Sequence, residues 1–298
     1  MSYSNILLTG GTGQTATALA QRLLSRTDAH LILTSRKGAG SVPSALSSFD
    51  SKRVKTVRFD WDDSSTLSSP FDDKIDAVYL VPHHSPGSVE RTKTFIDLAL
   101  ENGVKRFVML GSSAVEIDGP GPGKFHKLLE DVRQSGKLKE YAVLRPSWFF
   151  TNLATQYAPG IISSDHVVSA AGDGKYGWVS VEDIAEAAFS ALTVPAEELY
   201  REYIITGPEL LNLDEVADVL SEILFRKITH VRLSESESME RVPQEHAQMM
   251  TQLDIAISNG LEERTFALED TEPGKLKRWI GKESFKDFIS ANTEAWKK

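Results

Sequence analysis

A glycine-rich stretch near the start of the chain has the spacing of a turn that binds phosphate groups. Residues 9–16 read TGGTGQTA, between an apolar run and a segment with helical periodicity. In the pattern Gly10-x-x-Gly13-x-x-Ala16, the first glycine permits a tight turn and the second lets the backbone approach a pyrophosphate. The small third residue allows close packing of helix against strand. The pyrophosphate then lies on the N–H groups at the start of the helix. We predict that this turn binds a dinucleotide through Gly10, Thr12, Gly13, Gln14 and Thr15.

The residues after the second apolar run indicate which dinucleotide binds. An NAD site usually has Asp or Glu at this point, which bonds the ribose 2′-hydroxyl. Here Ser35, Arg36 and Lys37 follow the run, and no carboxylate is present. The two cations can neutralise a 2′-phosphate while Ser35 donates a hydrogen bond. The sequence therefore predicts NADP(H) as the cofactor, and the alternative is an ordinary basic loop.

Further cofactor contacts are expected where the other strands end, because ligands of open α/β sheets bind beyond the carboxyl ends of the strands. Asp60 and Trp61 follow the third apolar run, where such folds contact the adenine edge, although Trp61 could equally pack in the core. By the same rule, the ends of the fourth and sixth runs contribute Val81, Pro82 and Pro146.

The same strand ends carry side chains that suit a substrate pocket. His83 and His84 follow the fourth run. Because adjacent histidines point in different directions and no Cys or carboxylate cluster lies nearby, we expect no metal site. One of them as a proton donor or substrate contact competes with loop histidines that have no role. The predicted substrate contacts are His83, His84, Trp148, Phe149 and Tyr157.

The proton relay typical of short-chain dehydrogenases, a Ser with a helix carrying Tyr-x-x-x-Lys, is incomplete. Ser112 and Ser113 stand in the approximate place of the serine, but the only tyrosine between them and residue 145 is Tyr141. On the expected helix, we predict that Lys127 holds the nicotinamide ribose and that His126 supplies a proton. The alternative for both is an exposed, basic helix face.

The missing relay favours one kind of substrate. Reduction of a carbonyl produces an alkoxide, which needs a proton. Reduction of a preformed iminium group gives a neutral amine and needs only a hydride in the correct orientation. The sequence therefore suits an imine or iminium better than a simple ketone.

Short apolar runs alternate with helical segments through the first half of the chain. Five of the six runs are continuous or nearly so, as expected for strands covered on both faces. They lie at residues 6–8, 31–33, 57–59, 77–81, 107–110 and 142–144. This alternation predicts an α/β fold with a doubly wound parallel sheet of the Rossmann type.

Regularity decreases after Trp148. A helix is predicted at 183–192, a strand at 203–205 and a loop at 234–245, and Asn212 with Glu215 resembles a capping box that opens another helix. We expect an NADP(H)-binding domain at 1–150, completed by about 176–206. The remainder, 151–175 and 207–298, would form a smaller, mainly helical substrate-binding cap.

Composition limits the partners of the chain. Its 298 residues, 41% of them hydrophobic, can bury a large core. The net charge of −9 disfavours nucleic acid, and the absence of cysteine excludes thiol chemistry and fits a reducing compartment. No run approaches the roughly 18 apolar residues of a membrane span, and the N-terminus lacks a leader pattern. We predict a cytoplasmic protein with a small-molecule partner; the oligomeric state is not indicated.

Several motifs together resemble one family. The turn at 9–13, LRPSWF at 144–149 and TNL at 151–153 are similar to the NmrA-like atypical short-chain dehydrogenases. Four more motifs resemble the festuclavine/agroclavine dehydrogenase branch, so that the similarity spans almost the whole chain. They are GDGK at 172–175, DIA at 183–185, GPELL at 207–211 and RKITHV at 226–231.

The resemblance implies an NADP(H)-dependent oxidoreductase of fungal alkaloid biosynthesis, acting on a bulky, prenylated indole alkaloid with an imine or iminium group. Related members couple redox chemistry to ring formation, which implies a bifunctional oxidoreductase/cyclase that promotes, for example, an intramolecular cycloaddition. Other NmrA-like proteins are dinucleotide-sensing regulators without turnover, and this is the alternative function. The aromatic and histidine residues near the strand ends favour the substrate pocket of an enzyme.

Overall fold

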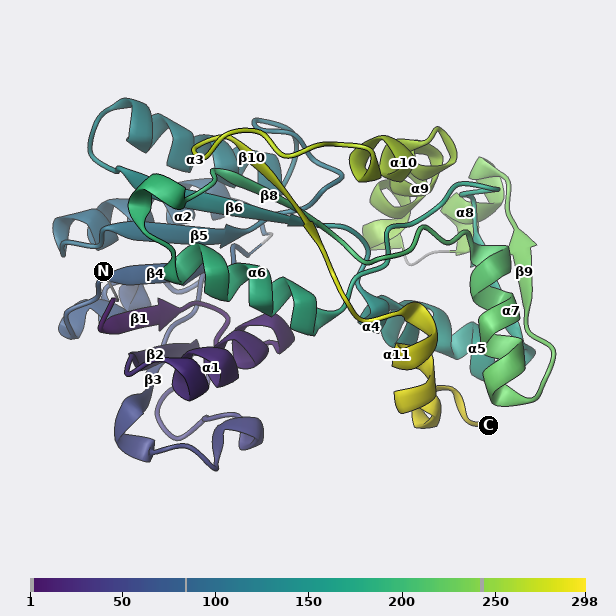
Figure 1. The fold of residues 1–298 in the computed structure, drawn as a ribbon, viewed down its shortest axis with the longest axis horizontal. Coiled ribbons are helices and arrows are strands. Elements are labelled where there is room, and N and C mark those ends of the chain that lie inside the picture. The colour runs from purple at the N-terminus through teal and green to yellow at the C-terminus, as the bar shows by residue number, and fades with distance from the viewer. Residues whose placement is uncertain (1–2, 84, 242–243) are drawn as a thin grey trace. The chain divides into compact units, whose positions relative to one another are not determined.

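The computed structural model describes residues 3–83, 85–241 and 244–298 (Figure 1). The chain divides into two compact units. Unit 1 comprises Met1–Arg145, Ile184–Tyr203 and Asp270–Lys277, and unit 2 comprises Pro146–Asp183, Ile204–Glu269 and Arg278–Lys298. The first segment of unit 1 ends at residue 145, and its last segment lies in the range that the sequence analysis assigned to the cap.

The main sheet has eight strands in the order β10-β8-β6-β5-β4-β1-β2-β3. Strands β1 to β6 pair in parallel; Leu7 of β1, for example, lies opposite Ile32 of β2 and Val78 of β4. The strand order reverses at β1, which creates the switch point where such sheets bind ligands. This is the predicted doubly wound sheet. Its strands are β1 (Asn5–Leu8), β2 (His30–Ser35), β3 (Val54–Arg58), β4 (Ala77–Leu80), β5 (Arg106–Leu110), β6 (Glu140–Pro146), β8 (Glu202–Thr206) and β10 (Leu276–Ile280).

Helices cover both faces of the sheet in unit 1 (Figure 1). Phe95 of α2 and Phe125 of α3 share a core with Leu7 of β1. On the opposite face, α1 and α6 lie side by side and are joined by an ion pair between Arg22 and Glu186, 2.9 Å long. These helices are α1 (Gln14–Arg26), α2 (Ser88–Glu101), α3 (Pro122–Gln134) and α6 (Val181–Thr193).

Unit 2 is mainly helical and contains a two-stranded parallel sheet, in which β7 (His166–Ser169) pairs with β9 (Thr229–Arg232). Its core gathers aromatic rings, among them Phe150 and Phe285 with centroids 5.6 Å apart. No helix in the described ranges has the length and apolar character needed to cross a membrane. The helices of unit 2 are α4 (Phe150–Asn152), a π-helical turn η5 (Leu153–Tyr157), α5 (Ala158–Ser164), α7 (Leu213–Leu224), α8 (Glu235–Arg241), α9 (Gln244–Ser258), α10 (Leu261–Phe266) and α11 (Phe285–Ala291).

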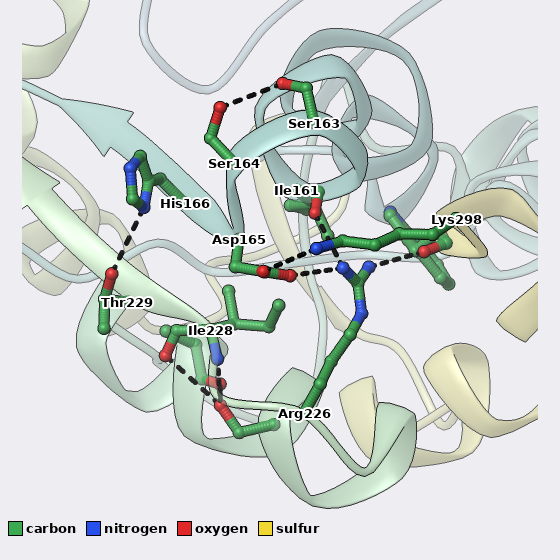
Figure 2. A network of polar contacts seen from close by, with 12 residues as sticks. Ile161, Ser163, Ser164, Asp165, His166, Arg226, Ile228, Thr229 and Lys298 are labelled. Carbon is green, nitrogen blue, oxygen red and sulfur yellow. Dashed lines mark hydrogen bonds and ion pairs between the residues drawn. The ribbon is translucent and has the colours of Figure 1, made fainter.

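An ion-pair network closes the end of α5 in unit 2 (Figure 2). Asp165, directly after α5, has a φ of 59°, a left-handed conformation that is unusual for a non-glycine residue. Its carboxylate accepts hydrogen bonds from Arg226 and from Lys298 Nζ, and Arg226 also donates to the carbonyl oxygen of Ile161. The network thereby ties the end of α5 to the segment before β9 and to the last residue of the chain.

Reciprocal side-chain caps fix the starts of two helices in unit 2. Asn212 Oδ1 accepts from Glu215 N at 2.9 Å and Glu215 Oε2 accepts from Asn212 N at 2.8 Å, which confirms the predicted capping box. The loop predicted at 234–245 is wrong for the described residues, because α8 forms there. Ser234 Oγ accepts from Glu237 N, and Glu237 accepts from Ser234 N, so a cap of the same kind starts α8 despite its polar composition.

Candidate functional site

The turn after β1 has the tight geometry that its glycines predict. Gly10 has a φ of 60°, which favours glycine, and Gly13 N donates to Gly10 O at 2.8 Å. A Cβ at Gly11 would lie 2.7 Å from Leu33 Cβ, so this glycine lets the turn pack against β2. Gly10 N also donates to Thr34 Oγ1 at 3.0 Å. The sequence analysis gave Gly11 and Thr34 no role, yet both hold the turn in position.

Helix α1 begins directly at this turn without a side-chain cap. Gly13 is the N-cap residue, and it has no side chain that could accept the first N–H groups of the helix. These groups form the positive end of the helix dipole. The start of α1, at Gln14 and Thr15, therefore has the geometry of an anion-binding site.

A pocket of about 570 Å³ lies in unit 1 beside the turn. Thr12, Ser35, Arg36 and Lys37 line it together with residues 39–42, and none of the lining residues is Asp or Glu. Arg36 and Lys37 are exposed. Ser35 Oγ accepts from Lys37 N at 3.2 Å, which leaves the hydroxyl proton available for donation. The pocket thus offers positive charge and hydrogen-bond donors to a phosphate group.

The end of β4 borders the same turn. Val81 Cβ would lie 3.4 Å from a Cβ at Gly10, and Pro82 follows. Thr9 Oγ1 accepts a hydrogen bond from Val81 N at 2.6 Å, which joins the ends of β1 and β4. The structure therefore brings Val81, one of the predicted cofactor contacts, next to the phosphate-binding turn.

The residues after β3 divide between core and surface. Trp61 is 9% exposed and packs edge-on against Phe59, with ring centroids 4.8 Å apart. This contact favours the core alternative for Trp61 over a contact with the adenine. Asp60 is half-buried, and its Oδ1 accepts from Asp62 N at 3.0 Å.

Asp62 joins the loops that follow β3 and β4. Its carboxylate accepts from Ser85 Oγ at 2.9 Å and from Arg91 Nη2 at 2.8 Å, and it lies 3.5 Å from His83 Nε2. About half of the His83 side chain is exposed, so its ring is accessible to a ligand. His84, the other predicted contact here, lies outside the described residues.

A buried arginine supports the loop after β5. Arg145 donates to the carbonyl oxygens of Ser112 and Ser113, each at 3.3 Å. Its guanidinium also pairs with Glu116 at 2.6 Å and with Glu202 at 2.5 Å. The two serines, predicted as catalytic, are thereby held in a fixed loop. Sequence reasoning missed Arg145, although a charged residue at the end of an apolar strand was a signal for it.

The two predicted relay residues on α3 differ in exposure, and the alternative of an exposed basic face holds for Lys127 but not for His126. His126 is only 3% exposed, and its ring lies edge-on to Tyr141 with centroids 6.1 Å apart. Burial lowers the pKa of His126 below its usual range. Lys127 is exposed and pairs with Asp131, one helical turn away. The phenol of Tyr141 donates to Glu130 at 2.6 Å. Burial together with this hydrogen bond raises the pKa of Tyr141.

Unit 2 carries the predicted aromatic contacts. The Trp148 ring is half-buried, 6.0 Å from the Tyr176 ring, and its Nε1 has no hydrogen-bond partner among the described residues. Phe149 forms an isolated bridge with Val179 and is also half-buried. Pro146, predicted as a cofactor contact, is buried at the end of β6. The indole N–H of Trp148 is therefore buried as well as unpartnered among the described residues.

A larger cavity of about 660 Å³ lies wholly within unit 2. Tyr157, predicted as a substrate contact, lines it together with Val168, Met249 and Met250. Asp254 of α9 supplies the only carboxylate on the lining among the side chains that the structure describes. Nothing in the sequence singled out Asp254, because a lone Asp in a helix does not reveal which cavity it faces.

The fold and the phosphate-binding turn define a Rossmann-type dinucleotide-binding protein. A family model described as NAD(P)H-binding matches residues 10–195. The chain belongs to this NAD(P)H-binding, NmrA-like family.

Full-length relatives narrow the class further. The chain is 37% identical to the agroclavine dehydrogenase of Claviceps fusiformis and 33% identical to festuclavine dehydrogenase easG of Aspergillus fumigatus, with 98% of each chain covered in both cases. The NADPH complex of the quinone oxidoreductase QOR2 from Escherichia coli has a TM-score of 0.72 at 20% identity, covering 96% of this chain and 99% of that one, and shows the shared fold. The comparisons support an NAD(P)H-dependent oxidoreductase.

Proposed function

We propose that the protein is an NADP(H)-dependent oxidoreductase that acts on an indole alkaloid bearing an imine or iminium group. The observation that carries the proposal is the basic pocket around Arg36 and Lys37, which lacks a carboxylate. Its support is the full-length similarity to clavine dehydrogenases, whose names identify both the reaction class and alkaloid substrates.

The residues of unit 1 fit a bound NADP(H). Gly10 and Gly13 leave the turn open, the uncapped start of α1 would receive the pyrophosphate, and Arg36 would face the 2′-phosphate. When bound, the nicotinamide donates or accepts a hydride. We assign contact with the nicotinamide ribose to Lys127, whose exposed pair with Asp131 is weak enough to exchange for a ligand.

The proton donors of unit 1 support an iminium substrate. Hydride addition to an iminium carbon yields a neutral amine without a proton. Tyr141 is committed to Glu130, and His126 is almost completely buried. We therefore assign Ser112 and Ser113, held by Arg145, to orienting the substrate and to hydrogen bonding during turnover. His126 remains a proposed proton source through the buried cluster around Arg145.

The proposed substrate contacts are aromatic, which suits a polycyclic cation. The Trp148 face can stabilise a positive charge by roughly 0.5–2 kcal/mol. Phe149 and Tyr157 supply apolar area, and His83 supplies a polar contact. In this proposal His84 belongs to the same group of substrate contacts.

The test is incubation of the protein with iminium-bearing indole alkaloids and NADPH, followed by mass analysis of the products. We expect the reduced amine as the product. Its mass exceeds that of the neutral, deprotonated form of the iminium compound by two hydrogen atoms. Products are analysed together with absorbance, because a reaction that couples redox to ring formation can regenerate NADPH and leave its absorbance unchanged.

The matched control is the Gly13→Val variant, in which a side chain at the turn blocks the pyrophosphate. It should give no product while remaining folded. Tight NADPH binding without turnover of any iminium-bearing indole would contradict the proposal and would favour a dinucleotide-sensing regulator.

A further inference from the structure

The cavity within unit 2 has the size and lining of a small-molecule site. Its volume of about 660 Å³ lies in the range that binds drug-sized ligands. Side chains of Tyr157, Val168, Met249 and Met250 make much of the wall apolar. Methionine side chains adapt to the shape of a ligand, so this wall suits a bulky apolar molecule.

Asp254 places a buried carboxylate in that apolar wall. Only 7% of the residue is exposed. Its Oδ2 accepts a hydrogen bond from Ala170 N at 2.8 Å, and its Oδ1 accepts one from the Tyr176 hydroxyl at 3.1 Å. Burial raises the pKa of the carboxyl above its usual range, although these two donors oppose the effect.

Among the residues whose side chains the structure describes, 3–83, 85–240 and 248–298, no cation pairs with Asp254. None of the lining residues is Lys or Arg, and the other titratable side chains on the lining are Tyr157 and His166. His166 lies on the exposed side of β7, with Nδ1 3.4 Å from Thr229 Oγ1 (Figure 2). Because a buried charge without a counter-ion is costly, the cavity favours a ligand that brings a positive charge.

Asp165 provides a contrast within the same unit. It immediately precedes His166, but its carboxylate already faces Arg226 and Lys298 (Figure 2). Its charge is therefore compensated inside the protein. Of these two carboxylates, only Asp254 both lines the cavity and lacks a cation among the described residues.

A chain of polar contacts begins at Ser169 on the cavity wall and resembles a different kind of site. Ser169 Oγ lies 3.0 Å from His230 Nε2, and His230 Nδ1 lies 3.2 Å from Asp214 Oδ1, as in a hydrolytic triad. Such a site also needs N–H donors for an oxyanion. The adjacent Ala170 N–H is bonded to the carboxylate of Asp254, which would also repel an oxyanion. The arrangement therefore suits a cation and disfavours acyl transfer.

We propose that the unit 2 cavity binds an apolar, polycyclic molecule through its positively charged nitrogen, with Asp254 as the counter-ion. The inference rests on the proposed function in taking the iminium or ammonium nitrogen of the substrate as this cation. The Tyr157 ring adds an aromatic surface for the same charge, and the methionines contact the apolar rings. Ser169 supplies a hydroxyl on the same wall.

The experiment compares two tricyclic indole probes of similar shape in isothermal titration calorimetry with the full-length protein. One is the permanently charged N-methyl dihydro-β-carbolinium, and the other is the neutral tetrahydrocarbazole. We expect Asp254→Asn to weaken binding of the cation about 10- to 100-fold, the loss expected when a charge-assisted contact is removed. Binding of the neutral probe should change less than about threefold.

Two further variants make the test independent of folding defects. Asp218→Asn makes the same charge change on the exposed side of α7 and should leave both affinities unchanged. Met250→Lys adds a cation to the half-buried rim and should weaken the charged probe selectively. Equal binding of the charged probe to the unaltered protein, to Asp254→Asn and to Met250→Lys would overturn the proposal.

Separate experiments can disprove the proposed redox function and the proposed cation site. Calorimetry of the charged probe in the absence of NADPH tests the cavity, whereas mass analysis with NADPH tests the reaction. Charge-selective binding without reduction of any iminium would remove the redox proposal and leave the cation site. Reduction with no effect of Asp254→Asn on KM would remove the cation site and leave the redox proposal.

Discussion

Arg36 and Lys37 line a pocket that contains no carboxylate, and this pairing distinguishes the two dinucleotides at the level of single side chains. A charge-assisted bond to the 2′-phosphate exists only with NADP(H). We expect Arg36→Ala to weaken NADPH about tenfold or more and to change NADH affinity little, as measured by fluorescence titration. Lys52→Ala, an exposed cation outside this pocket, is the control. Equal losses for both cofactors would contradict the assignment.

Gly11 and Gly13 belong to one turn, but Gly11 is needed for packing of the turn and Gly13 for binding of the cofactor. A Cβ at Gly11 would lie 2.7 Å from Leu33 Cβ and 2.9 Å from Thr34 N, where backbone must shift. Gly11→Ala should therefore lower the free energy of unfolding by about 1–3 kcal/mol in urea titrations. At Gly13 the nearest atom is Gly10 O at 3.0 Å, and the residue is exposed. Gly13→Val should instead abolish NADPH binding with a smaller change in stability; the reverse pattern would contradict these roles.

Helix α3 buries an imidazole, which couples the stability of this element to pH. Burial lowers the pKa of His126, Arg145 lowers it as well, and Glu202 opposes them. The unfolded imidazole titrates near its ordinary value of about 6.5. As pH falls below that value, the unfolded state binds a proton more readily than the folded state, so stability decreases. Between about pH 7 and 5.5, His126→Gln should lose less stability than the unaltered protein in denaturant titrations.

The matched control for this pH experiment is His30→Gln, because His30 is an exposed histidine at the start of β2. That variant should keep the pH dependence of the unaltered protein. A His126→Gln protein whose stability decreases as steeply as that of the unaltered chain would contradict the linkage to this residue.

At the same scale, the elements differ in how far the sequence predicts them. The continuous apolar runs predicted β1, β2, β4, β5 and β6, because strands buried on both faces leave a strong local signal. Strand β3 lies at the edge of the sheet with one buried residue, and the run at 57–59 marks only its end. The short strands β7 and β9 mix polar and apolar residues over four positions each, and β10 is half-exposed, so none of them leaves such a signal. Helix α8 looked like a loop because its stability depends on the pair Ser234 and Glu237 rather than on an apolar face.

The site shows the same division. Residues that act through backbone geometry near one motif, such as Gly10 and Gly13, could be predicted because their chemistry is local in sequence. Other site residues act through partners from distant segments of the chain: Arg145, Asp62 and Asp254. Arg145, for example, contacts both residues 112–116 and Glu202. No spacing rule encodes those contacts. The sequence predicted aromatic residues as ligand contacts in general. Whether a given ring contacts a ligand or packs in the core, as Trp61 does against Phe59, depends on its neighbours in the folded protein.

At the scale of the whole molecule, the charge balance agrees with the proposed substrate. The net charge is −9, and an acidic surface raises the local concentration of cations. This long-range effect is screened by salt, whereas a pair with the buried Asp254 is screened much less. Salt should therefore slow the association of a cationic alkaloid more than it weakens the final complex.

The two units also divide the proposed work, since the phosphate-binding turn belongs to unit 1 and the half-buried Trp148 to unit 2. Trp148 has an unpartnered Nε1 among the described residues and an aromatic face suited to a cation. Trp148→Ala should lower kcat/KM for an iminium alkaloid about tenfold, because roughly 0.5–2 kcal/mol of cation–aromatic attraction is lost together with apolar contact. NADPH affinity, measured separately by titration, should change less than about twofold. Trp148→Phe keeps an aromatic face without the N–H, so its kcat/KM should lie between those of the unaltered protein and Trp148→Ala. If Trp148→Ala weakened NADPH as much as it slowed turnover, or left turnover unchanged, substrate recognition would not belong to this residue.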